Sequence, residues 1–154
     1  MTEKESADIS EIPQWHHLPA NKFNPHAWVI GEPDVGDGVW IGAFTVIDAS
    51  GGLTIGPGSN VSAGAHIYTH STVKRCLNSS PSEDSQPVER ASVLIGSNVY
   101  IGANATILMG CEIGDQCVIG AGAVLKEFTK VPPRSLVVGV PAKIIEDGAL
   151  KYIF

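Results

Sequence analysis

An aliphatic side chain recurs at every sixth position through most of this 154-residue chain. The recurring positions form two short runs and one long run: Val35, Ile41 and Ile47; Ile55, Val61 and Ile67; and Ile95, Ile101, Ile107, Ile113, Ile119, Leu125, Val131 and Val137. A period of six matches neither the 3.6-residue turn of a helix nor the two-residue alternation of a strand. The repeat therefore predicts a solenoid in which each hexad supplies one short strand and one turn.

The other positions of the hexad favour a triangular coil. Glycine often follows the aliphatic residue, and a small or β-branched residue stands four positions after it, as Gly102 and Ala105 do after Ile101. We expect three hexads to complete one circuit, with each aliphatic side chain inward and about 4.8 Å from its equivalent in the next coil. Glycine would relieve crowding where the chain bends. The predicted fold class is all-β, a parallel β-helix.

The departures from the period predict the domain organisation. Residues 1–29 lack the repeat and are expected to cap the open end of the coil, because an uncovered solenoid end exposes strand edges. Residues 30–145 form the predicted β-helix domain, with two extra residues at a corner in 49–53 and a long inserted loop at 71–94. Loops of that length in a compact domain are often functional. Residues 146–154 form a predicted tail, and the ending is expected to add a short strand or helix.

Composition narrows the class of protein. The net charge of −6 disfavours nucleic acid as a partner, because phosphate binding needs a basic surface. No apolar run approaches the length of a membrane span, and the acidic start lacks the features of a signal peptide. A cytoplasmic protein without a membrane partner is therefore expected. Three scattered cysteines do not suggest a disulfide framework, and Cys111 and Cys117 occupy small inward positions of the hexad, which favours a core role.

With the hexads, the segment HIYTH at 66–70 and the ending IGAGAVLKEFTKVPPRSLVVGVPAKII at 119–145, the chain resembles the hexapeptide-repeat acyltransferases. It looks similar in particular to maltose and galactoside O-acetyltransferases and to polysaccharide-biosynthesis acetyltransferases. The resemblance covers roughly residues 35–145. It implies a left-handed β-helix and a homotrimer with active sites between neighbouring subunits. It also implies acetyl-CoA as the acetyl donor, bound along the groove there, with no metal required.

The resemblance implies that His70, which follows the strand Ile67-Tyr68-Thr69, is the general base. A sugar hydroxyl or an amine must lose a proton as it attacks the thioester carbonyl, and an imidazole suits that work. The segment is one residue shorter than in the related sugar enzymes and lacks their proline, so a different acceptor pocket is expected. His66 precedes the inward Ile67 and is expected to point outward. From the residues alone, a loop histidine that binds a backbone carbonyl stays an open alternative for His70.

Asp48 is the second predicted catalytic residue. It follows Ile47, which we expect to lie one coil below Ile67, so its carboxylate should come within reach of His70. There it could orient the imidazole or touch the acceptor. A turn carboxylate before the corner at 49–52 is the alternative.

Four residues are predicted to contact coenzyme A. By resemblance, the Ala103 amide would bind the thioester oxygen in the transition state, and Ala121 would lie along the pantetheine arm. Lys143, in a Pro-Ala-Lys element, and then Lys126 would bind the nucleotide phosphates. Solvated surface lysines are the alternative for both. They belong to a set of cations expected to gather at the end of the coil: Lys126, Lys130, Arg134 and Lys143.

The predicted function is therefore an acetyl-CoA-dependent O-acetyltransferase that acts on a saccharide or a nucleotide-linked sugar. N-acetylation of an amino sugar is one alternative. Another is a γ-class carbonic anhydrase, which holds zinc with three histidines, although only His66 and His70 lie on the coil here. A structural solenoid without catalysis is the third.

Overall fold

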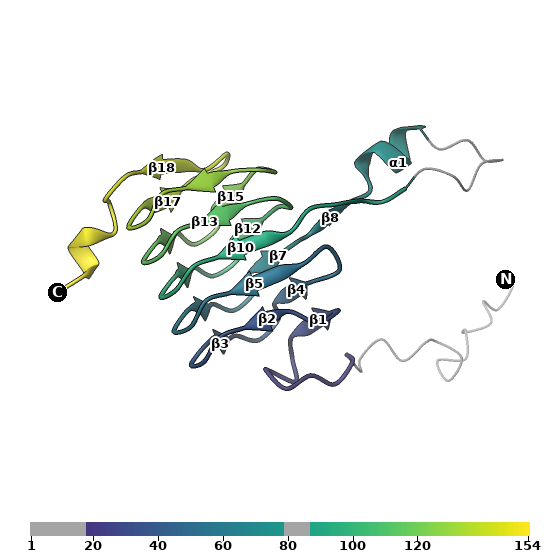
Figure 1. Cartoon of the computed structure of the whole chain (residues 1–154), viewed down its shortest axis with the longest axis horizontal. Helices are drawn as coiled ribbons and strands as arrows, with labels where there is room; N and C mark the ends of the chain where they lie inside the picture. Colours follow the sequence, from purple (N-terminus) through teal and green to yellow (C-terminus); the bar gives the residue numbers. More distant parts are fainter. Residues whose placement is uncertain (1–17, 79–86) are drawn as a thin grey trace, which may run out of the picture.

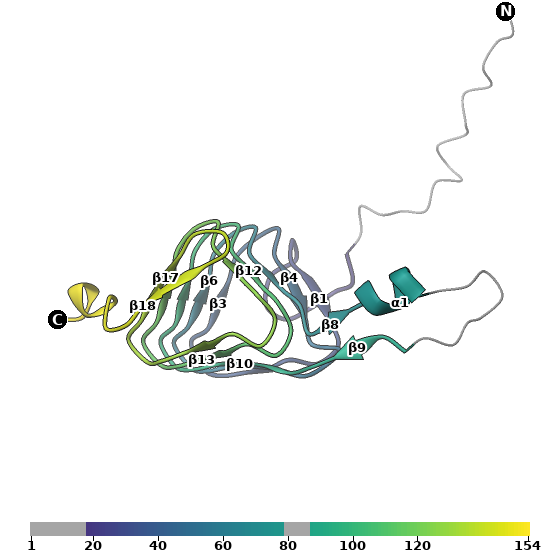
Figure 2. The ribbon, with the colours of Figure 1, turned by 90° about the horizontal axis from the view of Figure 1, so that it is seen from above.

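The computed structural model describes residues 18–78 and 87–154. This part of the chain is a parallel β-helix of triangular cross-section (Figures 1 and 2), and the predicted all-β class and left-handed β-helix are confirmed. Three parallel sheets form its faces. Sheet A contains β1 (Trp28–Ile30), β4 (Val46–Asp48), β7 (His66–Ile67), β12 (Thr106–Ile107) and β15 (Val124–Leu125). Sheet B contains β2 (Asp34–Val35), β5 (Leu53–Ile55), β10 (Val93–Ile95), β13 (Glu112–Ile113) and β16 (Lys130–Val131). Sheet C contains β3 (Trp40–Ile41), β6 (Asn60–Val61), β11 (Tyr100–Ile101), β14 (Val118–Ile119), β17 (Leu136–Val138) and β18 (Lys143–Ile145).

The aliphatic ladder is the core. In sheet C, Ile101 pairs with Val61 on one side and with Ile119 on the other, so equivalent hexads stack directly. The ladder residues from Ile41 to Val137 are all buried, and only Val35, in the second strand, is partly exposed. Full burial of one such side chain contributes roughly 1.5–3 kcal/mol. Because each coil rests on the next, the repeat itself supplies the stability.

Glycine at the corners leaves room for the neighbouring coil. A Cβ atom at Gly102 would lie 2.5 Å from the backbone nitrogen of Ala121, and one at Gly56 would lie 2.5 Å from the carbonyl carbon of Gly96. The expected relief of crowding therefore comes from backbone of the next coil. Cys111 and Cys117 are buried as predicted, and burial raises the pKa of both thiols.

The long insertion leaves the coil as a two-stranded ribbon at the corner between sheets A and B (Figure 1). β8 (His70–Ser71) pairs with β9 (Glu89–Arg90), and α1 (Val73–Asn78) follows β8. The Lys74 ammonium lies 2.7 Å from a Glu89 carboxylate oxygen and ties the helix to the ribbon. The coil resumes at Val93, inside the predicted loop of 71–94, because Val93 and Ile95 both point inward opposite Leu53 and Ile55.

Both ends of the coil carry irregular or antiparallel segments. The first strand begins at Trp28, inside the segment predicted as a cap; residues 1–17 of that cap lie outside the described residues. At the other end, the chain reverses and β18 pairs antiparallel with β17, followed by the 3₁₀ helix η2 (Leu150–Tyr152). The ending thus contains both a strand and a helix. Among the described residues, no helix is long and apolar enough to cross a membrane.

Candidate active site

His70 lies where sheet A gives way to the ribbon. Inward and outward positions alternate through this segment: Ile67 and Thr69 are buried, whereas His66, Tyr68 and His70 are partly exposed on the outer face. The Tyr68 hydroxyl oxygen lies 3.0 Å from Nδ1 of His66. The tyrosine ring also packs edge-on against both imidazoles, with centroids 5.8 Å from His66 and 6.4 Å from His70. The strand therefore presents a row of three ring side chains to the outside of the coil.

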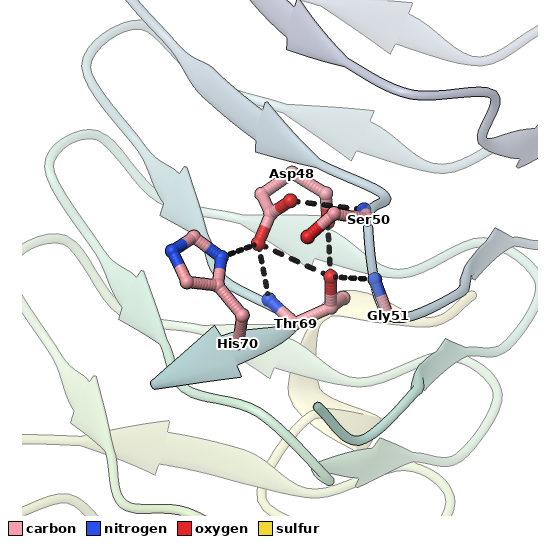
Figure 3. A network of polar contacts seen from close by, with 5 residues as sticks. All are labelled: Asp48, Ser50, Gly51, Thr69 and His70. Atoms are coloured by element: carbon pink, nitrogen blue, oxygen red, sulfur yellow. Dashed lines mark hydrogen bonds and ion pairs between the residues drawn. The ribbon is translucent and has the colours of Figure 1, made fainter. Parts of the chain in front are cut away.

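The Asp48 carboxylate is the direct partner of His70 (Figure 3). Nδ1 of His70 lies 2.6 Å from Oδ2 of Asp48, and the Asp48 residue is fully buried, whereas the His70 side chain is 32% exposed. The Thr69 amide donates to Oδ2 at 2.8 Å, and the Ser50 amide donates to Oδ1 at 2.9 Å. The structure thus brings the two predicted catalytic residues together.

The ionised Asp48 carboxylate determines which ring nitrogen of His70 donates the hydrogen bond between them. Burial alone would raise the pKa of this carboxyl, but hydrogen bonds from the Thr69 and Ser50 amides, the Ser50 hydroxyl and His70 outweigh burial and lower the pKa to about 2. An ionised carboxylate only accepts hydrogen bonds, so Nδ1 of His70 carries the proton and donates it. In the neutral imidazole Nε2 is then the nitrogen with the free lone pair, and Figure 3 shows it pointing away from Asp48. This is the arrangement of a base oriented by an acid.

The predicted coenzyme A residues fall into separate places. Ala103 and Ala121 stack in adjacent coils at the corner between sheets C and A, where the Gly122 amide donates to the Ala103 carbonyl at 2.9 Å. Within the described residues, the backbone amides of Ala103 and Ala121 donate no hydrogen bond to another backbone group. Lys126 instead follows β15 at the same edge of sheet A as His70. Lys143 lies in β18, the antiparallel edge strand of sheet C.

Within one chain, the four cations that were expected to gather are distributed around the last coils. Residues one hexad apart lie on different faces of a triangular coil, so a group that is close in sequence is spread around the circuit. Two of its members have acidic neighbours instead: Lys130 Nζ is 3.7 Å from Glu112 Oε1, and Arg134 Nε is 3.2 Å from Asp147 Oδ1. Lys126 and Lys143 are exposed on separate faces.

Two neighbours of the pair were not singled out from the sequence. Thr69 occupies an inward position between Tyr68 and His70, which the alternation of buried and exposed residues could have indicated. Arg90 is directly opposite His70 in the ribbon, so the two side chains share one face. That pairing spans an aperiodic loop and leaves no sequence signal. In residues 18–78 and 87–154, no three His, Cys, Asp or Glu residues are grouped so that they could hold a metal ion.

The surface has hollows away from the Asp48–His70 pair. One, of about 590 Å³, lies on the outer face of sheet B between Leu94 and Lys130. Another, of about 370 Å³, lies beside Tyr100 and the C-terminal residues. Neither hollow includes His70.

Comparison with known proteins identifies the repeat. Residues 92–127 match the family model described as bacterial transferase hexapeptide (six repeats). The chain is 34% identical to a serine acetyltransferase of Buchnera aphidicola subsp. Schizaphis graminum, over 73% of this chain and 40% of the relative. It is 32% identical to WbbJ of Escherichia coli strain K12, which carries the name of a lipopolysaccharide biosynthesis O-acetyl transferase, over 71% of this chain and 58% of the relative. The chain thus spans about half the length of these curated relatives.

A solved structure agrees with the family match. A hexapeptide-repeat-containing acetyltransferase from Vibrio cholerae O1 biovar eltor, complexed with acetyl coenzyme A, superposes with a TM-score of 0.61 at 28% identity. The superposition covers 73% of this chain and 58% of that protein. With its ladder, its corner glycines and these relatives, the chain contains the bacterial transferase hexapeptide repeat and is similar to hexapeptide-repeat acetyltransferases.

Proposed function

We propose that this protein transfers the acetyl group of acetyl-CoA to a hydroxyl of a saccharide or a nucleotide-linked sugar. The observation that carries the proposal is the Asp48–His70 pair, a buried and ionised carboxylate bonded to an imidazole whose other nitrogen faces outward. The names of the similar proteins support acetyl transfer, and WbbJ supports an acceptor of the saccharide class.

The geometry of the pair supports the following chemical steps. Nε2 of His70 takes the proton of the acceptor hydroxyl while the oxygen attacks the thioester carbonyl carbon. The resulting imidazolium is stabilised by Asp48, and the negative charge on the carbonyl oxygen is met by the amide of Ala103. Collapse of the tetrahedral intermediate breaks the carbon–sulfur bond, and the imidazolium returns the proton to the departing thiolate of coenzyme A. A positioned base of this kind contributes roughly 10²–10⁴ in rate.

The proposed site is completed by a second copy of the chain in a homotrimer. Lys126 lies at the edge of sheet A near His70, whereas Lys143 lies in the edge strand of sheet C, so one chain would not offer both cations to one coenzyme A. Figures 1 and 2 both place β18 and β8 far apart. A groove between neighbours would bring His70 and Lys126 of one subunit toward Ala121 and Lys143 of the next. A cytoplasmic location goes with this proposal.

The test is acetyl transfer by the purified full-length chain. Acetyl-CoA is supplied with a panel of saccharides, nucleotide-linked sugars, amino sugars and serine, and released coenzyme A is measured. We expect a hydroxyl-bearing saccharide to be acetylated, and we expect His70→Ala to lower kcat/KM by roughly 10²–10⁴. His66→Ala is the matched control, because His66 lies four residues before His70 on the same outer face and touches Tyr68 but not Asp48.

The outcomes separate the alternatives. Full turnover by His70→Ala together with loss in His66→Ala would refute the assignment of the base. Transfer to an amine only would make the protein an N-acetyltransferase. Absence of acetyl-CoA binding in calorimetry would leave a structural solenoid.

A further inference from the structure

Thr69 joins two segments that meet at the active-site corner. Its residue is fully buried, and its hydroxyl oxygen lies 3.0 Å from the Asp48 carbonyl oxygen and 3.1 Å from Asp48 Oδ2. The Gly51 amide donates to the same hydroxyl oxygen at 2.8 Å. The hydroxyl accepts from the Gly51 amide, and its one proton is shared between the Asp48 carbonyl oxygen at 3.0 Å and Asp48 Oδ2 at 3.1 Å. The hydroxyl therefore links the corner loop to the catalytic carboxylate (Figure 3).

These bonds fix the rotation of the Asp48 carboxylate. Oδ1 is held by the Ser50 amide and Oδ2 by the Thr69 amide, and the Thr69 hydroxyl shares its proton between Oδ2 and the Asp48 carbonyl oxygen. With both oxygens engaged, Oδ2 is the one directed at His70, 2.6 Å from Nδ1. The carboxylate in turn selects the ring nitrogen of His70 that carries the proton.

The corner loop is shaped for this contact. A Cβ atom at Gly51 would collide with the Thr69 carbonyl oxygen, so only glycine allows the loop to approach so closely. The Gly52 amide donates to the Ala49 carbonyl at 3.0 Å and closes the turn. The two-residue departure from the hexad period at 49–53 thus forms a turn from which the Ser50 amide donates to Asp48 and the Gly51 amide donates to Thr69.

We propose that Thr69 is a positioning residue, whose hydroxyl orients Asp48 so that His70 keeps its proton on Nδ1 and presents Nε2 to the acceptor. The inference rests on the proposed function of His70 and adds a residue that acts through Asp48. Any residue other than proline at position 69 keeps the backbone amide. Substitution therefore tests the contribution of the Thr69 hydroxyl.

The experiment uses Thr69→Val, which removes the hydroxyl, and Thr69→Ser, which keeps it. We expect Thr69→Val to lower kcat roughly 10-fold, as loss of a buried hydrogen bond to a charged group does. The KM for acetyl-CoA should stay unchanged, and Thr69→Ser should retain most of the activity. In long-range ¹H–¹⁵N spectra of the imidazole, the wild type should show one tautomer protonated at Nδ1, and Thr69→Val should show a mixture.

A double variant tests whether Thr69 acts through Asp48. If it does, Thr69→Val has no further effect on kcat in the Asp48→Asn background. An equal loss in both backgrounds, or a wild-type tautomer in Thr69→Val, overturns the inference. Should Thr69→Val fail to fold, Thr69→Ala is measured by the same spectra, with a wild-type tautomer again refuting it.

The spectra also separate this inference from the proposed function, because they need no turnover. A shifted tautomer with full activity would contradict the role of His70 and leave the positioning intact. An unchanged tautomer would contradict only the role of Thr69.

Discussion

Asp48 combines complete burial with an ionised side chain, and this combination links the site to the stability of the fold. The pKa of its carboxyl is lowered from 3.8 to about 2 by the amide, hydroxyl and imidazole bonds that offset burial. A carboxyl whose pKa is lower in the folded state stabilises the fold above its unfolded pKa and loses that contribution as the pH falls through the folded value. The window for Asp48 therefore runs from about pH 4 down to about pH 2.

Urea unfolding across this window tests the linkage. We expect the free energy of unfolding of the wild type to fall by about 2 kcal/mol more than that of Asp48→Asn between pH 4 and pH 2, because the amide does not titrate. Asp34→Asn, which removes an exposed carboxylate of sheet B, serves as the control and should follow the wild type. Parallel curves for the wild type and Asp48→Asn would contradict the ionised, hydrogen-bonded state of the carboxylate.

Sequence reasoning predicts the pairing of Asp48 with His70 but not the contacts around that pair, for a physical reason. Asp48 and His70 follow ladder positions, so counting hexads predicts that they meet. The Thr69 hydroxyl accepts from Gly51, which lies in the two-residue departure from the period, and the Thr69 amide donates to Asp48 just before that departure. Arg90 reaches His70 through pairing across the insertion. Periodicity specifies contacts between equivalent positions and says nothing of contacts that aperiodic segments make.

At the scale of the coil, the hexad predicts how the side chains pack, because each of its six positions has the same surroundings in successive coils. The glycine after the inward aliphatic residue faces the backbone of the next coil, and Gly56 shows this most directly among the corners of sheet B, since a Cβ there would lie 2.5 Å from the Gly96 carbonyl carbon and oxygen. The end of the insertion was harder to predict, because the strand that resumes at Val93 has two inward residues where most hexads supply one.

The corner packing predicts a clear cost for a single methyl group. We expect Gly56→Ala to lower the free energy of unfolding by roughly 1–3 kcal/mol, because backbone atoms of the next coil must move. Ser62→Ala is the matched control: Ser62 follows the inward Val61 and already carries a Cβ, so the change should stay within about 0.5 kcal/mol. Chemical unfolding of both variants measures the difference. Wild-type stability of Gly56→Ala would contradict the close contact between this corner and the backbone of the next coil.

At the scale of the whole molecule, the triangular coil separates what the sequence places close together. The cations near the C-terminal end of the chain lie on different faces because successive hexads turn the chain around the axis. A coenzyme A that needs both Lys126 and Lys143 would therefore have to lie between two copies of the chain. Under the proposed function, a neighbouring copy would complete the wall that the prism provides, and the oligomer would be part of the active site.

Mixed trimers of two inactive variants test that arrangement. His70→Ala and Lys143→Glu chains with different affinity tags are coexpressed, and trimers that carry both tags are isolated. If each site takes His70 from one subunit and Lys143 from the next, every mixed trimer contains one complete site, and activity should recover to roughly one third of the wild type. If both residues served a site within one chain, every site would lack one of them and the mixed trimers would stay inactive. Unmixed trimers of each variant provide the baseline, and sedimentation at three times the 16.2 kDa chain mass verifies the assembly.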